Sequence, residues 1–234
     1  MALPSLNASP AYELTVPSTG EQLKFRPFLV KEQKILMLAN ESQDKKQIIN
    51  AMLNTITSCV DGADTNNLTT FDVDYIFTQI RAKSVGEKIE FKFPCKQCES
   101  PNETMVNLEE LKMGEVKGEK IVELNDKVSV KLKYPSYSNI LRSMTDKVKS
   151  ETEMAMDVII ACMDSVLTDE ENISLKHETK DEINKFVDSM SGKQFEEVSK
   201  FVQDMPQLEH TVKFNCVSCG HQNKLELKGL DDFF

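Results

Sequence analysis

The sequence has few of the residues from which phosphate-binding loops and catalytic metal motifs are built. It contains eight glycines and three histidines among 234 residues. The glycines form neither G-x-x-x-x-G-K-[ST] nor G-x-G-x-x-G, and the motifs H-E-x-x-H and G-x-S-x-G do not occur either. Carboxylates are plentiful, but they stand in runs such as Asp169–Glu171, which are typical of a solvated surface. The sequence therefore predicts an interaction protein and not an enzyme.

Clustered positive charge and long apolar runs are also missing. The net charge is −10 and no basic run is longer than Lys45-Lys46, which argues against nucleic acid and anionic membranes as partners. The longest apolar run, Val158–Met163, is far shorter than the roughly 18 residues of a membrane span. Residues 1–7 lack the basic and apolar segments of a signal peptide, so we expect the chain to stay in the cytoplasm where it is made.

The spacing of apolar residues changes along the chain and predicts an α+β fold. Apolar residues alternate with polar ones before and after the turn Pro17–Gly20, which predicts an N-terminal β-hairpin, and a helical block follows it. We expect central β-strands, C-terminal helices and two zinc-knuckle-like C-x-x-C elements. We divide the chain into four regions of one composite domain: 1–86, the hairpin plus helices; 87–135, a first knuckle and β region; 136–206, a helical region; and 207–234, a second knuckle and the C-terminal tail.

Several local signals fix expected element boundaries. We expect a helix to begin near Thr70, which can cap it, and a second β-hairpin to turn at Asn125-Asp126. Two capping boxes predict helix starts, and one stripe of apolar residues predicts a single helix through position 166. These signals are Thr179 with Glu182, Ser191 with Gln194, and the stripe Ala155, Val158, Ile159, Cys162 and Val166.

One cysteine element occurs twice, 121 positions apart. Residues 91–98 resemble residues 212–219, and a later asparagine, Asn102 or Asn223, matches as well. Each copy is predicted to be a strand, a C-x-x-C turn and a returning strand, which is the form of a zinc knuckle. Two knuckles supply four thiolates and leave no open position for a catalytic water, so they predict a structural zinc site. The candidate ligands are Cys95, Cys98, Cys216 and Cys219.

The two pairs are separated by 117 residues, which is more than in a compact zinc ribbon. Loop closure costs grow only slowly with length, so this separation permits one shared site. Three other interpretations remain open: knuckles with free thiols, zinc shared between subunits, and a redox C-x-x-C pair. Cys59 and Cys162 lie in helical apolar patterns and are expected in the core, and His221 is expected to pack beside the second knuckle.

Two stretches of the N-terminal third resemble a known family. The first runs from Pro10 to Leu36 and includes Tyr12-Glu13-Leu14, Pro17-Ser18-x-Gly20 and Phe25-Arg26-Pro27-Phe28-Leu29-Val30-Lys31-Glu32. The second is Leu68-Thr69-x-Phe71-Asp72-Val73-x-Tyr75-Ile76-Phe77, continuing to Gly86. Both resemble the T4-like phage baseplate family, whose members are hub subunits and hub-assembly factors of contractile tails.

The resemblance implies a structural or assembly role in the central baseplate hub. It implies contacts with other hub and tail-tube proteins in a homo- or hetero-oligomer and assembly in the host cytoplasm. Two fates then remain open: a place in the virion, or the role of a transient assembly chaperone. The terminal aromatic pair, Phe233 and Phe234, is a candidate partner-binding anchor, with packing on its own domain as the alternative. Two other functions remain open: a zinc-ribbon adaptor of transcription or translation machinery, and a thiol oxidoreductase.

Overall fold

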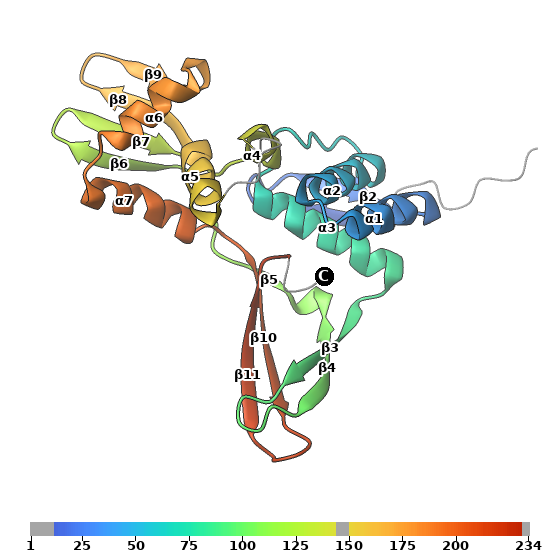
Figure 1. Cartoon of the computed structure of the whole chain (residues 1–234). Helices are drawn as coiled ribbons and strands as arrows, with labels where there is room; N and C mark the ends of the chain where they lie inside the picture. Colours follow the sequence, from blue (N-terminus) through green and yellow to red (C-terminus); the bar gives the residue numbers. More distant parts are fainter. Residues whose placement is uncertain (1–11, 144–149, 231–234) are drawn as a thin grey trace, which may run out of the picture. The chain divides into compact units, whose positions relative to one another are not determined.

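A computed structural model describes residues 12–143 and 150–230 and divides the chain into two compact units (Figure 1). Unit 1 comprises residues 1–115 and 206–234, and unit 2 comprises residues 116–205. Unit 2 is therefore inserted in the sequence of unit 1. The described residues form helices and small antiparallel sheets, which confirms the α+β class. None of the described helices is both long enough and apolar enough to cross a bilayer.

The N-terminal part of unit 1 is a hairpin and three helices, as the sequence predicts. Its elements are β1 (Tyr12–Thr15), β2 (Gln22–Phe25), α1 (Val30–Ser42), α2 (Lys45–Cys59) and α3 (Thr70–Val85). The Asp44 carboxylate accepts hydrogen bonds from the first backbone N–H groups of α2, which fixes where that helix begins. Helix α3 is capped by Thr69 and not by Thr70, since Thr69 and Asp72 form the capping box.

Two buried carboxylates tie this block together. Asp72 accepts hydrogen bonds from the backbone N–H and hydroxyl of Ser18, which joins α3 to the turn after β1. Glu32 on α1 pairs with Arg26 at 2.9 Å, and the same guanidinium donates to the carbonyl of Ser58 on α2. Ser18, Arg26, Glu32 and Asp72 belong to the two stretches that carry the family resemblance, so those stretches supply most of the polar side chains that assemble the block.

The rest of unit 1 consists of two long hairpins. The first pairs β3 (Lys88–Pro94) with β4 (Pro101–Asn107), and the second pairs β10 (Leu208–Asn215) with β11 (Gln222–Lys228). A short 3-10 helix, η1 (Leu108–Glu110), follows β4. Between the hairpins lies a small apolar cluster, in which Val106 of β4 packs with Leu208, Val212 and Leu227 of the second hairpin.

Strand β5 (Lys112–Met113) pairs with the start of β10, so the segments that lead into and out of unit 2 lie side by side. The backbone N–H of Gly114 also donates to the carbonyl of Gln207 at 3.0 Å. The 117 residues between the cysteine pairs are thus mostly a folded unit whose two ends are held together. This arrangement removes the difficulty that the long separation posed for a shared site.

Unit 2 is a four-stranded antiparallel sheet with helices on one face (Figure 1). Its strands are β6 (Lys120–Asn125), β7 (Val128–Leu132), β8 (Met163–Thr168) and β9 (Asn172–Ser174). Its helical segments are α4 (Tyr137–Ser143), α5 (Glu151–Cys162), η2 (Leu175–His177), α6 (Lys180–Asp188) and α7 (Gly192–Gln203). Alternate residues such as Val122 and Val130 face the helices and pack with Cys162, Val198 and Phe201.

The structure confirms several sequence-based boundaries in unit 2 and corrects two. The capping boxes of α6 and α7 occur as predicted, whereas the hairpin turns at Asp126-Lys127, one residue later than predicted, because Asn125 still pairs with Val128. The single helix expected through Val166 is wrong, because α5 ends at Cys162 and β8 begins at Met163. Region 136–206, expected to be helical, therefore also contributes strands β8 and β9. A buried strand and a buried helix give similar apolar patterns over so few residues.

Candidate metal centre

The two C-x-x-C turns have the same backbone geometry. In the first, the N–H of Cys95 donates to the carbonyl of Ser100 and the N–H of Glu99 donates to that of Cys95, both at 2.9 Å. In the second, Cys216 donates to His221 at 2.8 Å and Gly220 donates to Cys216 at 2.9 Å. Glu99 and Gly220 both adopt a positive φ, 58° and 73°, as this tight turn requires. The sequence repeat is therefore a structural repeat.

The four sulfurs meet where the two hairpin turns face each other. Their Sγ atoms lie within 4.8 Å of one another. Two distances between the hairpins are 3.7 Å, from Cys95 to Cys219, and 3.6 Å, from Cys98 to Cys216. A tetrahedral zinc site with Zn–S bonds of about 2.3 Å has sulfurs about 3.8 Å apart. The sulfurs thus lie close to the corners of a zinc tetrahedron and too far apart for disulfide bonds.

Backbone N–H groups stabilise charge on the two buried sulfurs. The N–H of Gln97 points at Cys95 Sγ, and the N–H of Ser218 points at Cys216 Sγ, each at 3.4 Å. The N–H of Cys219, together with that of Ser218, lowers the pKa of Cys216 to about 6. Burial opposes ionisation of Cys95, but N–H groups of Gln97 and the next residue outweigh it and lower the pKa of Cys95.

The thiol of Cys219 differs from the two buried ones, because its surroundings favour the protonated form. A backbone N–H of His221 favours the thiolate of Cys219, but the nearby sulfurs and burial outweigh it and raise the pKa of Cys219 to about 12. Four thiolates at these distances repel one another unless a positive ion lies between them. A divalent ion bound by thiolates removes that repulsion, because a coordinating thiol is deprotonated outright. A metal held here would have four protein ligands, which is the arrangement of a structural site.

Two buried asparagines join the hairpins beside the sulfurs. Asn223 on the second hairpin accepts a hydrogen bond from the backbone N–H of Lys96 in the first turn, at 2.9 Å. Asn102 on the first hairpin accepts one from the N–H of Val217 in the second turn, also at 2.9 Å. Asn223 additionally donates to Cys95 Sγ at 3.5 Å. In the sequence these asparagines are visible only as part of the repeat. The hydrogen bonds that they accept from the opposite hairpin depend on the tertiary structure.

The two other cysteines lie in the core as predicted, but His221 is exposed and does not show the packing beside the second knuckle that was expected of it. Cys59 and Cys162 are buried, and burial raises the pKa of their thiols to about 11 and about 12. These values keep both thiols protonated and unreactive at neutral pH. His221 contributes its backbone to the second turn, while its side chain is exposed. Among the described residues, the four knuckle cysteines form the only group that could hold a metal ion.

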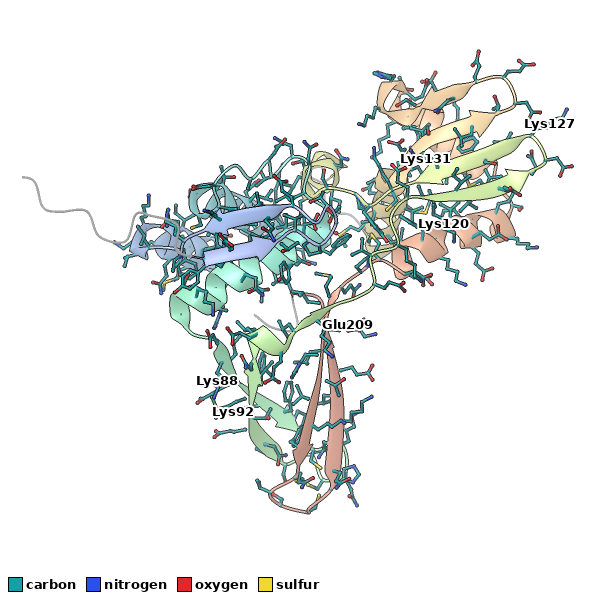
Figure 2. The ribbon with its side chains drawn as sticks, turned by 180° about the vertical axis from the view of Figure 1, so that it is seen from behind. Lys88, Lys92, Lys120, Lys127, Lys131 and Glu209 are labelled. Carbon is teal, nitrogen blue, oxygen red and sulfur yellow. The ribbon has the colours of Figure 1, made fainter. Side chains whose placement is uncertain are left out.

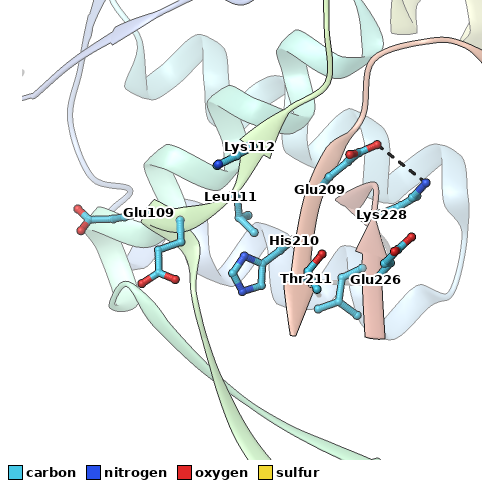
Figure 3. A pocket seen from close by; sticks show the side chains of 10 residues that line it. Glu109, Leu111, Lys112, Glu209, His210, Thr211, Glu226 and Lys228 are labelled. Atoms are coloured by element: carbon cyan, nitrogen blue, oxygen red, sulfur yellow. Dashed lines mark ion pairs between the residues drawn. The ribbon is translucent and has the colours of Figure 1, made fainter. Parts of the chain in front are cut away.

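A shallow groove in unit 1 is separate from the cysteines. It is formed where Glu109–Lys112 passes the first residues of β10 and the end of β11, with a volume of about 640 Å³ (Figure 3). His210 and Leu111 line it, and a 4.0 Å ion pair joins Glu209 to Lys228. Its charged lining consists of four glutamates and two lysines, a small acidic excess.

Two lysines of the first hairpin, Lys92 and Lys96, make polar contacts within the protein. Figure 2 shows Lys88 and Lys92 on strand β3. Lys92 pairs with Glu103 at 2.9 Å, and Lys96 Nζ donates to the carbonyl of Lys224 at 2.9 Å. A zinc-ribbon adaptor bound to nucleic acid needs a basic face, and these pairs do not supply one. The other candidate contacts, Phe233 and Phe234, lie outside the described residues.

Comparison with known proteins gives one match. The family model described as T4 bacteriophage base plate protein matches residues 9–234, nearly the whole chain. No significant match was found among curated proteins or among solved structures. The match covers both stretches from which the resemblance was drawn, both knuckles and the inserted unit. The chain therefore belongs to the T4 bacteriophage base plate protein family.

Proposed function

We propose that the protein is a structural or assembly component of the central hub of a contractile phage tail baseplate. It acts through protein–protein contacts and without catalytic turnover. The observation that carries the proposal is the family match over residues 9–234. The described residues add support, because their one cluster of reactive groups is a closed four-cysteine arrangement.

In this role the chain contacts other hub and tail-tube proteins during assembly in the host cytoplasm. Phe233 and Phe234 are proposed as one anchor of such contacts. Large aromatic side chains bury much area with few rotatable bonds, which makes them frequent energetic centres of interfaces.

Disruption of the gene in the phage tests the role. The expected result is normal heads without functional baseplates, seen by electron microscopy of infected-cell lysates. Complete tails in the mutant would contradict the assignment. Supplying the intact gene from a plasmid controls for effects on neighbouring genes.

We also infer that Cys95, Cys98, Cys216 and Cys219 bind one structural zinc ion. The sulfur spacing, the N–H groups directed at the buried sulfurs and the Asn102–Asn223 exchange all support a tetrahedral thiolate site. Zinc bound here joins two hairpins that share a cluster of only four buried apolar residues. Such a small cluster gives limited stability by itself, so a metal has a clear structural purpose.

Metal analysis of protein purified under reducing conditions, without added metal or chelator, tests this site. About one zinc per chain is expected, since four thiolates complete one tetrahedral shell. Less than about one tenth of an equivalent contradicts the proposal. Cys95→Ser and Cys216→Ser should lose zinc, whereas Cys59→Ala, which alters a buried cysteine far from the knuckles in sequence, should retain it.

A further inference from the structure

Each C-x-x-C turn presents one shielded sulfur and one accessible sulfur. Cys95 and Cys216, the first cysteines of the two turns, are 1% and 3% exposed. Cys98 and Cys219, the second cysteines, are exposed. Oxidation of cysteine follows exposure as well as thiolate character, so an oxidant in solution reaches Cys98 and Cys219 first.

Two close sulfur contacts between the hairpins each join an exposed cysteine to a buried one. Cys219 Sγ lies 3.7 Å from Cys95 Sγ, and Cys98 Sγ lies 3.6 Å from Cys216 Sγ. A disulfide bond is about 2.05 Å long, so each pair has to approach by only about 1.6 Å. An exposed sulfur that has been oxidised therefore has a second sulfur beside it, on the opposite hairpin, with which it can form a disulfide.

Hydrogen bonds that do not involve the sulfurs hold the two turns in this position. Asn223 accepts a hydrogen bond from the backbone of Lys96, and Asn102 accepts one from the backbone of Val217, both at 2.9 Å. The ammonium group of Lys96 also donates to the carbonyl of Lys224 on the second hairpin. These contacts keep each exposed sulfur opposite its buried partner while a first bond forms.

The length of chain between the paired cysteines also favours bonds between the hairpins. The close pairs are 124 and 118 residues apart in the sequence, whereas the cysteines of one turn are three apart. A disulfide that closes a long loop constrains the unfolded chain more than one that closes a short loop. The folded protein in turn favours the long-range bond, provided that the native positions of the sulfurs permit it.

We propose that oxidation replaces the metal joint between the hairpins by two disulfide bonds, Cys95–Cys219 and Cys98–Cys216. This inference rests on the proposed zinc site and baseplate role, and it adds what the four sulfurs do when the metal is lost. A phage particle passes from a reducing cytoplasm into oxidising surroundings, where disulfides persist. The hairpins then stay joined under conditions that oxidise zinc ligands.

The oxidant is a peroxide, and each disulfide consumes one molecule of it. The exposed thiolate attacks a peroxide oxygen, so that an S–O bond forms, the O–O bond breaks and hydroxide leaves. The buried thiolate of the opposite hairpin then attacks the sulfenic sulfur, so that the S–S bond forms, the S–O bond breaks and a second hydroxide leaves. Four thiolates and two molecules of hydrogen peroxide thus give two disulfides and four hydroxide ions. Zn²⁺ is released as its ligands are consumed.

Peptide mapping of peroxide-treated protein identifies the bonds. Zinc-loaded full-length protein is treated with hydrogen peroxide, its remaining thiols are alkylated, and it is digested without reduction for mass spectrometry. Cleavage after Lys96 separates Cys95 from Cys98, and fragment ions between Cys216 and Cys219 assign their partners. The expected result is the two bonds between the hairpins, with the bound zinc found in the filtrate. The buried thiols of Cys59 and Cys162 should stay reduced and serve as internal controls.

Single variants make two bonds compete within one chain. In Cys98→Ser the bond Cys95–Cys219 should form and Cys216 should be recovered as a free thiol. The matched variant Cys219→Ser should form Cys98–Cys216 and leave Cys95 free. Bonds within a turn in these variants or in the parent protein, a Cys95–Cys216 bond, bonds between chains, or zinc retained with all thiols intact would each overturn the proposal.

Hydrogen exchange shows whether the oxidised joint replaces the metal. Oxidised, zinc-free protein should keep amide protection in both hairpins, whereas reduced protein treated with a chelator should lose it. Equal loss in the two samples contradicts the inference. Zinc-loaded protein that forms its bonds within the turns also contradicts it but leaves the metal site intact, whereas untreated protein without zinc contradicts the metal site itself.

Discussion

The two units are stabilised by different kinds of contact. Unit 2 has eleven buried residues in one apolar cluster between its sheet and helices. The hairpins of unit 1 share four buried apolar residues and partly buried ones such as Phe93 and Phe214, and the sulfurs and the hydrogen bonds of Asn102 and Asn223 complete their joint. Apolar packing supplies the larger part of stability in an ordinary core. We therefore expect unit 2 to be stabilised mainly by packing, and the hairpins to depend more on specific polar groups and on the proposed metal.

The helical block of unit 1 also combines an apolar core with buried polar contacts. It has large buried apolar residues such as Phe25 and Phe71, but it also buries the Arg26–Glu32 pair and Asp72. A buried charge is tolerated only when it is fully paired and hydrogen-bonded. Unit 1 therefore contains more groups whose loss leaves a partner unsatisfied, and it should respond more sharply to metal removal and to acid.

Metal removal should produce the largest difference between the units, measured as the protection of their backbone amides from hydrogen exchange. A zinc chelator, or Cys216→Ser, is expected to abolish hydrogen-exchange protection in both hairpins, because the metal joins them and little apolar area replaces it. Strands β6 to β8 and helix α7 should keep their protection. Exchange measured by mass spectrometry reports both units in one sample. Equal loss in both units, or no loss in the hairpins, contradicts the contrast.

A core truncation in unit 2 should have the converse effect. Phe201 is buried and its ring stacks on Tyr134 at 5.1 Å between centroids. Phe201→Ala is expected to lower the unfolding free energy of unit 2 by about 3–5 kcal/mol. Zinc content should remain unchanged. Chemical denaturation followed by metal analysis checks both quantities, and zinc loss in this variant would mean that the site depends on unit 2.

Acid should affect the helical block of unit 1 through Glu32. Burial alone would raise the pKa of this carboxyl, but hydrogen bonds from Arg26 and from the backbone of Leu29 lower it below 4.5. A lowered pKa means that the stabilisation is present above the ordinary pKa and is lost as pH falls through the lowered value. Glu32→Gln should cost roughly 3 kcal/mol near neutral pH, since Arg26 loses its buried partner.

The acid effect is measured by comparing the two proteins over a pH series. The difference in unfolding free energy should shrink as pH falls through the lowered pKa of Glu32, where the native carboxyl becomes protonated too. Glu41→Gln, at an exposed position of the same helix, serves as the control and should show little difference. A Glu32→Gln penalty that is constant from pH 7 to pH 3 would show that the pair does not act through its charge.

Loss of the hydrogen bonds that Asn102 and Asn223 accept from the opposite hairpin should have the smallest effect on stability. Asn102→Leu and Asn223→Leu keep the side-chain size but leave the N–H of Val217 or Lys96 without its acceptor. A loss of about 1–3 kcal/mol in hairpin stability is expected for each, with faster zinc transfer to a chelator. Asn102→Asp retains the acceptor and should be milder. Asn215→Ala, at an exposed position next to Cys216, is the control, and equal zinc release in all variants contradicts the inference.

Local sequence signals predicted much of the fold because they act over short distances. The capping boxes at Thr179 and Ser191 are complete within four residues, and the hairpin turn next to Asn125-Asp126 is equally local. The cysteine repeat predicted the two C-x-x-C turns for the same reason. The change from helix to strand at Met163 was not predictable, because buried apolar residues suit either element. Residues 163–168 form a strand because they pair with β7, which is a tertiary contact.

The sequence did not predict which distant segments lie together in the tertiary structure. The 117-residue separation gave no sign that β5 and β10 pair across the ends of an inserted unit. The match of Asn102 with Asn223 was visible, but the bonds they exchange depend on how the hairpins face each other. The sequence also did not predict which residues of α1 are exposed, since the spacing of Ile35, Leu36 and Leu38 alone does not reveal which of them point inward.

X-ray absorption at the zinc edge tests the central claim, that both hairpins complete one metal site within a single chain. On monomeric protein, separated by size and containing about one zinc, the account predicts four sulfur neighbours at about 2.3 Å and no nitrogen or oxygen neighbour. A shell of two sulfurs with nitrogen or oxygen would show that only one knuckle binds the metal. Four sulfurs found only in a dimer with one zinc per two chains would place the site between subunits, and either result contradicts the account.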